Sequence, residues 1–317
     1  MKMVTKVYLR QGRFKKMLFG LIVGLVLVGL AALVAIPPLV MGDMINMHVD
    51  FAKVYDASDF GLTATELTLR TADGYQISAF EVEVANPKAV VIFISGIHNP
   101  SVTAFFGHAR MLAENGYASI LYDLRSHGKS DGEVIALGHL ETRDTQAVVD
   151  YIKSKTVYTQ VPIVVYGLSM GGAVAINSIG QIPELDGVIS MSAYSSWEDM
   201  FVENMEPLGA PAWLTTLQKP FVKLYTIYKF GLDTVDIYPK EQIKALGSRP
   251  ALIMHSEGDS QVGFKNFERI VAQAPSHVET WTRPGDHHMM TTDFFNPEND
   301  LEYAQRVLGF LERNFGH

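Results

Sequence analysis

Cysteine is missing from all 317 residues of the chain, and acidic residues are missing from its first 42 positions. The first absence excludes disulfide bonds, thiolate nucleophiles and zinc sites built on cysteine. The sequence also lacks internal repeats and low-complexity tracts. With 48% hydrophobic and 19% charged residues, the composition is that of a folded protein with a sizeable core.

Positive charge is concentrated at the N-terminus. Six of the 26 basic residues precede Met17, whereas all 34 acidic residues lie from Asp43 onward. The chain after residue 42 therefore carries 20 basic and 34 acidic residues, a formal net charge of −14. Because a domain of that charge repels phosphate groups, we expect no nucleic-acid partner and interpret the acidity mainly as a solubilising surface.

A long apolar stretch follows the basic residues. Met17 to Ile36 contains 20 residues without a charge, and a helix of that length spans roughly 30 Å, the hydrocarbon thickness of a bilayer. Pro37 and Pro38 are expected to end this helix. The preceding basic residues favour a cytoplasmic N-terminus, which leaves the rest of the chain on the extracytoplasmic side of the membrane.

Two other interpretations of this stretch compete with a membrane anchor. A cleaved signal peptide has a shorter apolar region and a small-residue cleavage site, and residues 33–37 are a poor match to such a site. A buried core helix is disfavoured because the stretch is apolar on all sides and precedes the first strand signals. We therefore expect a cytoplasmic segment over residues 1–16, an anchor over 17–36, a juxtamembrane connector over 37–63 and a folded domain over 64–317.

Strand and helix patterns alternate through the folded domain. Short apolar runs typical of buried strands are separated by segments with helical spacing, which predicts an α/β fold with a mostly parallel sheet and helices on both faces. A hairpin is expected first, with strands at 66–70 and 76–84. Further strands are expected at 89–94, 118–122, 162–166, 187–191, 251–254 and 277–281, and helices at 108–115, 140–153, 172–179, 264–272 and 301–315.

Residues 194–246 break this alternation. They contain no buried-strand run and are rich in aromatic and methionine side chains. We interpret the segment as an inserted, mostly helical cap. Most of its aromatic side chains are expected to pack on the main body, and a few are expected to line an apolar acyl pocket.

Two serines lie in the pattern G-x-S-x-G, Ser169 within residues 167–171 and Ser130 within residues 128–132. The pattern is typical of a nucleophilic serine on a sharp turn between a strand and a helix, where side chains larger than glycine would clash. Only Ser169 has a buried-strand run directly before it and a helix of small residues directly after it. We therefore predict that Ser169 is the nucleophile and that Ser130 is a turn residue.

An activated serine needs a base, and the base needs an orienting carboxylate. These groups follow such a serine in the order Asp or Glu, then His. Asp259 lies just after the strand expected at 251–254, with Glu257 as the second candidate, and His287 and His288 both follow the last expected strand. Because the carboxyl ends of parallel strands meet at one edge of a sheet, these groups are expected to lie near Ser169. Periodicity alone does not choose between the two histidines.

Two backbone N–H groups are predicted to form an oxyanion hole, those of Met170 and Ile97. One donor in such sites follows the nucleophile, and the other lies in the loop after an early strand. That strand is expected to end at Ile94, so Ile97 falls in the correct loop. His98, in the same loop, is interpreted as a solvated loop residue.

Several segments together resemble the α/β-hydrolase superfamily over roughly residues 64–315. The register of this resemblance implies that His288, rather than His287, is the base and that the second match at Ser130 is structural. Ser95 and Ser256 stand where the family usually has histidine and glycine. The similar segments are Ile94-Ser-Gly-Ile97 (oxyanion turn), Asp123-Leu-Arg-Ser-His-Gly-Lys-Ser130 (D-x-R-G-H-G-x-S loop), Gly167-Leu-Ser-Met-Gly-Gly172 (nucleophile elbow), His255-Ser-Glu-Gly-Asp-Ser-Gln-Val262 (acid loop) and Gly285-Asp-His-His288 (histidine loop).

Within the superfamily, the chain looks most like membrane-anchored bacterial hydrolases described as serine-aminopeptidase-like or dienelactone-hydrolase-like. The resemblance implies a serine hydrolase with the triad Ser169, His288 and Asp259, acting through an acyl-enzyme on a small-molecule ester or thioester with an apolar acyl group. No cofactor or metal is expected, and the lipid bilayer is the expected partner of the N-terminal helix. A serine peptidase and a non-catalytic, membrane-tethered binding module are the alternatives.

Overall fold

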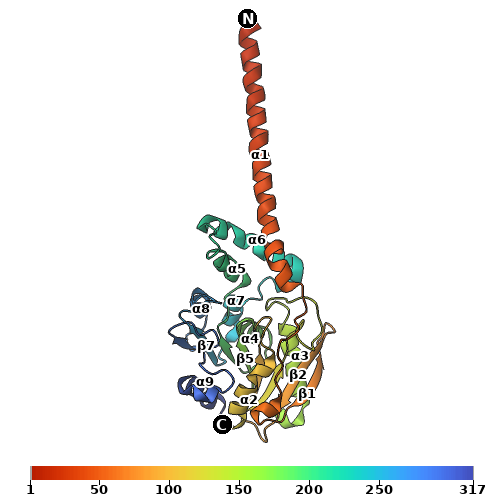
Figure 1. The fold of residues 1–317 in the computed structure, drawn as a ribbon, viewed down its shortest axis with the longest axis vertical. Coiled ribbons are helices and arrows are strands. Elements are labelled where there is room, and N and C mark those ends of the chain that lie inside the picture. The colour runs from red at the N-terminus through yellow and green to blue at the C-terminus, as the bar shows by residue number, and fades with distance from the viewer. Residues whose placement is uncertain (1, 317) are drawn as a thin grey trace.

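Eight strands form one sheet in the computed structural model, which describes residues 2–316 (Figure 1). Their order is β1-β2-β4-β3-β5-β6-β7-β8. The first two form the predicted hairpin, β2 also pairs antiparallel with β4, and every other pairing is parallel. The predicted α/β fold is therefore confirmed. The strands are β1 (Thr65–Arg70), β2 (Gln76–Val82), β3 (Val90–Ile94), β4 (Ala118–Tyr122), β5 (Ile163–Leu168), β6 (Gly187–Met191), β7 (Ala251–Ser256) and β8 (Glu279–Arg283).

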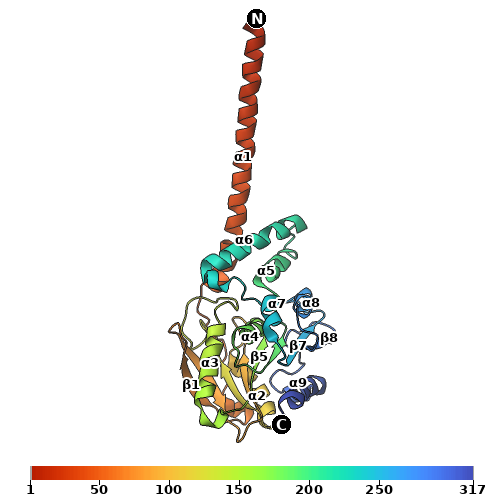
Figure 2. The same ribbon diagram turned by 180° about the vertical axis from the view of Figure 1, so that it is seen from behind.

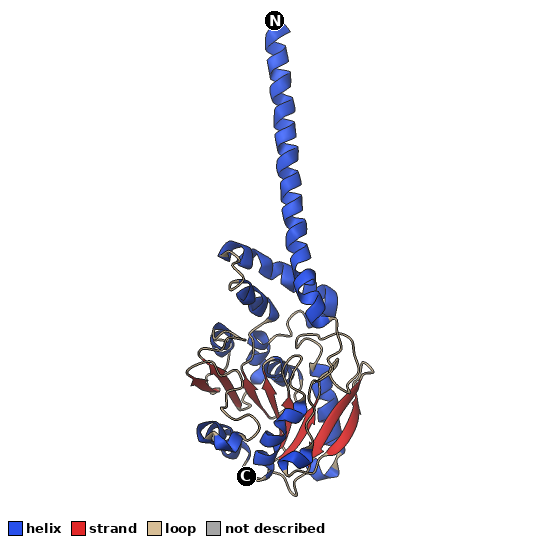
Figure 3. Cartoon of the chain, viewed as in Figure 1, coloured by secondary structure: helices blue, strands red, loops and turns tan. Residues whose placement is uncertain are grey.

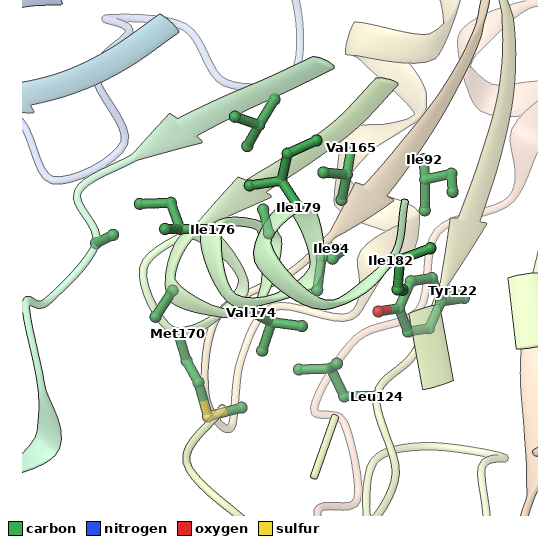
Figure 4. Close-up of a cluster of buried hydrophobic side chains, with 14 of the residues drawn as sticks. Ile92, Ile94, Tyr122, Leu124, Val165, Met170, Val174, Ile176, Ile179 and Ile182 are labelled. Carbon is green, nitrogen blue, oxygen red and sulfur yellow. The ribbon is translucent and has the colours of Figure 1, made fainter. Parts of the chain in front are cut away.

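Helices cover both faces of this sheet (Figures 2 and 3). Side chains alternate along β3, so that Ile92 and Ile94 join one buried cluster and Val91 and Phe93 join the other. The first cluster includes α3, α4 and α8, and Figure 4 shows it around α4; the second includes α2 and α9. These helices are α2 (Phe106–Ala113), α3 (Thr142–Ser154), α4 (Met170–Gln181), α8 (Lys265–Val271) and α9 (Leu301–Phe315).

The limits of most elements agree with the sequence patterns to within two residues, and β4, β6 and α9 match them fully. The last strand is displaced by two residues at both ends, since it runs from Glu279 to Arg283 rather than from 277 to 281, and α2 is displaced by as much. The last strand lies at the edge of the sheet, and only Trp281 among its residues is buried. An edge strand of this kind has no continuous apolar run to mark where it begins.

The N-terminal helix α1 (Lys2–Ile45) projects far from the sheet (Figure 1). Its stretch Phe14–Ile45 is long and apolar enough to cross a membrane, and its most apolar part is not buried in the rest of the protein. The prediction that Pro37 and Pro38 end this helix is wrong, because both lie inside it. The helix therefore also covers residues 37–45 of the expected connector.

A side chain from a distant segment replaces one of the hydrogen bonds that the prolines remove from this helix. Proline lacks an N–H, so Pro37 leaves the carbonyl oxygen of Leu33 without its usual partner four residues on. Gln218 fills this position, since its Nε2 donates to the Leu33 oxygen at 2.9 Å. The buried side chain of Gln218 thus compensates for one of the two hydrogen bonds that the prolines remove.

The segment over residues 194–246 contains helices and no strand, as the sequence predicted. Its longest helix lies across the base of α1 (Figures 1 and 2). Besides the Gln218 contact, the Trp197 ring nitrogen lies 3.3 Å from the Met41 sulfur of α1. The cap helices and the end of α1 therefore pack together. The cap helices are α5 (Trp197–Met205), α6 (Ala212–Phe230) and α7 (Pro239–Gln242).

A buried ion pair holds the loop that follows β4. Nε and Nη2 of Arg125 donate to Asp144 Oδ1 on α3 at 2.9 and 2.7 Å, and Nη1 donates to Asp73 at 2.9 Å. The side chains of Arg125 and Asp144 are 3% and 0% exposed. Because each charge is paired and hydrogen-bonded, the loop is held tightly against α3.

We expect Asp144→Asn to lower the free energy of unfolding by about 3 kcal/mol, because it removes the main counter-charge of a buried guanidinium. Glu66→Gln is the matched control, since the Glu66–Lys129 pair is 69% and 74% exposed and should contribute about 1 kcal/mol or less. Urea denaturation in detergent would measure both. Equal losses in the two variants would contradict the importance assigned to the buried pair.

Candidate active site

The predicted nucleophile lies at a strained turn between β5 and α4. Ser169 has φ 57° and ψ −119°, a backbone conformation that L-residues rarely adopt. A side chain at Gly167 would overlap the Gly171 carbonyl, and one at Gly171 would overlap the carbonyl oxygens of Ile94 and Ser95. The two glycines of the motif are thus required by the close approach of backbone to backbone.

The loop after β3 lies directly beside this serine. A Cβ atom added to Gly96 would lie 3.3 Å from the Cβ of Ser169 and 3.8 Å from its hydroxyl oxygen. Met170 is the first residue of α4, so its N–H has no acceptor within the helix. Ile97, the other predicted donor, directly follows Gly96 and is half-buried. Met170 and the residue before Ile97 therefore adjoin the predicted nucleophile on two sides.

Asp259 and His288 are in direct contact at the carboxyl edge of the sheet. Nδ1 of His288 lies 2.8 Å from Asp259 Oδ2 and 3.1 Å from Oδ1. Burial alone would raise the pKa of Asp259, but the hydrogen bond to His288, the charge of that ring and two backbone N–H groups outweigh it. The pKa of Asp259 therefore lies below its usual range, and the carboxylate is charged at neutral pH.

Backbone contacts connect this pair to the predicted nucleophile. The N–H of Ser169 donates to the carbonyl oxygen of Met191, at the end of β6, at 2.8 Å. The next residue, Ser192, donates its hydroxyl to the carbonyl oxygen of His288 at 2.7 Å. The loop that carries His288 is therefore fixed to the strand adjacent to Ser169.

A serine that departs from the family pattern joins the acid loop to the histidine loop. The Ser256 hydroxyl donates to the carbonyl oxygen of Gly285 at 2.9 Å and accepts the N–H of His287 at 2.9 Å. The Ser260 N–H donates to the carboxylate of Asp286 at 3.1 Å. The sequence analysis treated Ser256 only as a departure and did not predict this role.

The alternative residues take other contacts. His287 has no contact with Asp259; its backbone N–H is used by Ser256, as above. Glu257 is exposed and accepts from Thr282 at 3.3 Å, away from the histidine. Ser130 is buried and donates to the Asp123 carbonyl at 2.7 Å, so it is the turn residue that the sequence predicted.

A chain of hydrogen bonds runs from the end of α1 to the predicted oxyanion loop. The ring Nε2 of His98 lies 3.1 Å from the carbonyl oxygen of Met44. The backbone N–H of His98 donates to Nε2 of His127 at 3.2 Å. Nδ1 of His127 lies 2.8 Å from the carbonyl oxygen of Arg125. His98, which the sequence analysis interpreted as a solvated loop residue, is half-buried and contacts two segments distant in the sequence.

The protonation of His127 follows from these partners. Nε2 accepts the His98 N–H, so the ring proton lies on Nδ1 and points to the Arg125 carbonyl. Burial is the main cause that lowers the pKa of His127, to about 4. The ring is therefore neutral near pH 7 and holds the loop that carries Ile97.

Among residues 2–316, no group of three or more histidine, aspartate or glutamate side chains is placed to hold a metal ion. The buried charged groups near Ser169 are instead paired with one another or with backbone groups. Asp259, for example, accepts the backbone N–H groups of Gln261 and Val262, both at 2.9 Å. The arrangement thus holds a histidine–carboxylate pair in loops joined to the serine turn, and these are groups suited to acyl transfer.

A protein-family model described as serine aminopeptidase, S33, matches residues 85–244, about half of the chain. The match spans β3 to α7 and includes the elbow at Ser169, the predicted oxyanion loop and most of the cap. Asp259 and His288 lie beyond its end.

Individual proteins show the same likeness at low identity. An uncharacterised protein of Bacillus subtilis, YqkD, is 22% identical over 85% of this chain and 86% of its own length. The quorum-quenching protein AidA of Acinetobacter baumannii is 25% identical over 71% of this chain and 88% of its own. A solved esterase structure from Pyrococcus furiosus superposes with a TM-score of 0.68 at 22% identity, covering 85% of this chain and 98% of the esterase. The esterase structure supports the fold.

The low pKa of His127 predicts how stability depends on pH. The folded-state pKa of about 4 lies below the ordinary value of 6.5, so the unfolded chain takes up this proton first as the pH falls. The stability that the neutral ring contributes is complete above pH 6.5 and is lost as the pH falls through about 4. The stability difference between the wild type and His127→Gln should therefore shrink over that range.

Urea denaturation of both proteins at several pH values would test this expectation. The other buried histidines titrate in both proteins, so the difference isolates His127. Glutamine carries an oxygen that can accept the His98 N–H but has no proton to gain. A stability difference that stays constant from neutral pH to about pH 4 would contradict the prediction.

Proposed function

Because the chain belongs to the serine aminopeptidase (S33) family of hydrolases, we propose that it is a serine hydrolase that cleaves an ester or thioester bond next to an apolar acyl group. The observation that carries this proposal is the 2.8 Å contact between His288 and Asp259 in loops joined to the strained Ser169 turn. A nucleophile, a base and an orienting carboxylate are the groups that acyl transfer requires.

In the proposed mechanism, Ser169 attacks the carbonyl carbon while His288 takes the hydroxyl proton through Nε2. Asp259 keeps the other ring nitrogen protonated and stabilises the imidazolium that forms. The N–H groups of Met170 and Ile97 bind the oxyanion of the tetrahedral intermediate. His288 then returns the proton to the leaving group, and water attacks the acyl-enzyme by the same route.

An apolar groove supports the preference for an apolar acyl group. The groove has a volume of about 320 Å³, within the range of small-molecule sites. Its lining residues are apolar except for Asn204. Met44 forms part of its wall, and the carbonyl oxygen of Met44 contacts His98 in the proposed oxyanion loop. The groove is lined by Ile36, Val40, Met41 and Met44 of α1, Trp197, Phe201, Asn204 and Met205 of α5, and Leu208 and Ala210.

The N-terminal helix is proposed to anchor the enzyme in a membrane. Its apolar stretch Phe14–Ile45 is preceded by four basic residues, and Lys15 and Lys16 lie near its start. Basic residues at one end of a membrane span favour the cytoplasmic side for that end. The hydrolase domain is accordingly proposed to be extracytoplasmic.

Labelling with a fluorophosphonate probe tests the nucleophile. We expect the probe to modify Ser169, and Ser169→Ala to abolish labelling and to lower kcat for an ester by about a million-fold. Ser130→Ala is the matched control because Ser130 lies in the same sequence pattern. It should keep its labelling and lose only about 1–2 kcal/mol of stability with its buried hydrogen bonds. A folded wild type that takes no label would instead support a non-catalytic binding module.

Filling the groove tests the acyl group. We expect Ala210→Trp to raise KM for a long-chain nitrophenyl ester by about tenfold or more, since each buried CH₂ contributes about 0.8 kcal/mol. KM for the acetyl ester should hardly change, because its acyl group is too short to enter the groove. Steady-state kinetics over a series of chain lengths would measure the effect. An equal rise in KM for short and long esters would exclude the groove as the acyl site.

A peptidase is the second candidate, because the matching family model carries the description of an aminopeptidase. Aminoacyl amides and esters offered at equal concentration separate the two functions. Faster cleavage of the amide would replace the esterase proposal while leaving Ser169 as the nucleophile.

A further inference from the structure

Helix α6 presents apolar side chains to the outside of the protein. Trp213, Leu217, Leu224 and Tyr228 are between 48% and 85% exposed. Their spacing of four, seven and four residues places them on one side of the helix. This set is called the outer face of α6. Exposed apolar patches of this kind mark surfaces that contact a protein or a membrane.

The inward side of the same helix is the more polar one. Thr215, Gln218 and Thr226 are 5%, 0% and 2% exposed, and they share the inward side with Val222 and Phe230. A surface helix of a water-soluble protein has the opposite arrangement, with apolar side chains inward and polar ones outward. The environment that α6 faces is therefore expected to be less polar than water.

The position of α6 identifies that environment. Gln218 of α6 donates to the carbonyl oxygen of Leu33 in α1 at 2.9 Å. Leu33 lies three residues before the end of the uncharged stretch Met17–Ile36, which corresponds to a depth of about 5 Å along the helix. If α1 spans a bilayer, the contact with α6 therefore lies near the end of the span. That is the depth of an interfacial helix, whose apolar face is buried about 5–10 Å into the boundary between headgroups and acyl chains. Exposed Leu208 and Leu232 flank α6 on its two sides.

The charge of this segment also differs from that of the rest of the domain. From Pro207 to Leu232 there is no acidic residue, and the segment contains three lysines, although the chain after residue 42 has a net charge of −14. One of these, Lys219, also pairs with Asp199. Positive charge beside exposed tryptophan and tyrosine is typical of a surface that meets anionic lipid headgroups.

We infer that the outer face of α6 docks into the outer leaflet of a lipid bilayer, so that the cap lies in the membrane interface. This inference rests on the proposed role of α1 as an anchor. The groove between α1 and α5 then opens at the level of the lipid acyl chains, since Ile36 and Leu208 both line it. A substrate with an apolar acyl chain reaches the proposed active site from the bilayer rather than through water.

Tryptophan fluorescence offers a direct test on the full chain. Trp213 is 65% exposed, whereas Trp197 and Trp281 are 8% and 5% exposed. The protein would be reconstituted in vesicles of phosphatidylcholine and phosphatidylglycerol, with or without bromine atoms on the upper acyl chains. We expect the wild type to lose the emission of Trp213 in brominated vesicles and to resist quenching by aqueous iodide. Trp213→Phe should lack this loss, which isolates Trp213 from the other two tryptophans.

Two outcomes of the fluorescence experiment would overturn the inference. Quenching of Trp213 by iodide but not by bromine would place the outer face of α6 in water. Protection from both quenchers, together with cross-linked dimers in the vesicles, would show that a second copy of the chain covers this face instead.

Activity measurements separate this inference from the proposed function. The variant W213S/L217S/L224S/Y228S should cleave a long-chain ester embedded in vesicles about tenfold more slowly than the wild type, as expected when apolar interfacial contacts are lost. Its cleavage of a water-soluble acetyl ester should not change. The control V157S/L301S removes two side chains that are 50% and 70% exposed outside the cap, and should affect neither rate. Equal rates of the α6 variant and the wild type on vesicles would contradict the inference.

Separate measurements test the hydrolase proposal and the membrane anchor independently of the docking of α6. Fluorophosphonate labelling at Ser169 reports on the proposed chemistry, and resistance of the protein to extraction by alkaline carbonate reports on the anchor. Loss of labelling with intact bromine quenching would refute the hydrolase proposal alone. Release by carbonate would refute the anchor, and with it the docking of α6.

Discussion

The arrangement of the proposed site depends on one close contact between two backbone segments, the start of α4 and the end of β3. At the start of α4, Gly171 lies against the carbonyl oxygens of Ile94 and Ser95 at the end of β3, and any side chain would overlap them. This approach fixes the first turn of α4 beside the loop after β3. It therefore determines, in a single contact, where Ser169 and the N–H of Met170 lie relative to Gly96 and Ile97. The strained φ of Ser169 is tolerated because the central strand β5 and the buried helix α4 hold the turn from both sides.

A second set of contacts joins the loops after β3 and β4 to the N-terminal helix α1. The buried pair of Arg125 and Asp144 holds the loop after β4. His127 in that loop accepts the backbone N–H of His98. The ring of His98 in turn contacts the carbonyl oxygen of Met44 at the end of α1. The neighbouring backbone adds to this connection, since Val49 exchanges hydrogen bonds with the same loop. A buried polar group left without a partner costs about 1–3 kcal/mol, so these groups favour one arrangement of the loops over others. The end of α1 thus packs against the loops after β3 and β4, the first of which lies beside the proposed nucleophile.

Local patterns predicted the parts of the fold that local chemistry determines. Continuous apolar runs marked the central strands, and the glycines around Ser169 marked the elbow, because both depend on neighbours in the sequence. The order of acid and histidine indicated Asp259 and left His287 and His288 open. The family resemblance favoured His288, and Asp259 and His288 are in contact in the structure. Tertiary contacts decided what the sequence analysis missed or mistook. Pro37 does not end α1, and Gln218, distant in the sequence, binds the carbonyl oxygen that the proline leaves without a partner. In the same way, nothing local reveals that Ser256 joins two loops.

The topology also places the anchor and the proposed chemistry on the same side of the sheet. Parallel strands send their carboxyl ends to one edge, so Ser169, Asp259 and His288 gather there whatever the substrate is. The end of α1 contacts the loops after β3 and β4, which leave the sheet at this same edge. With α1 across a bilayer, the edge that carries the proposed active site faces the lipid, and the cap lies between them. An apolar outer face on α6 would be unfavourable in water, and in this position it faces the bilayer. The reversed polarity of α6 is therefore consistent with the topology, which places the cap between the sheet edge and the lipid.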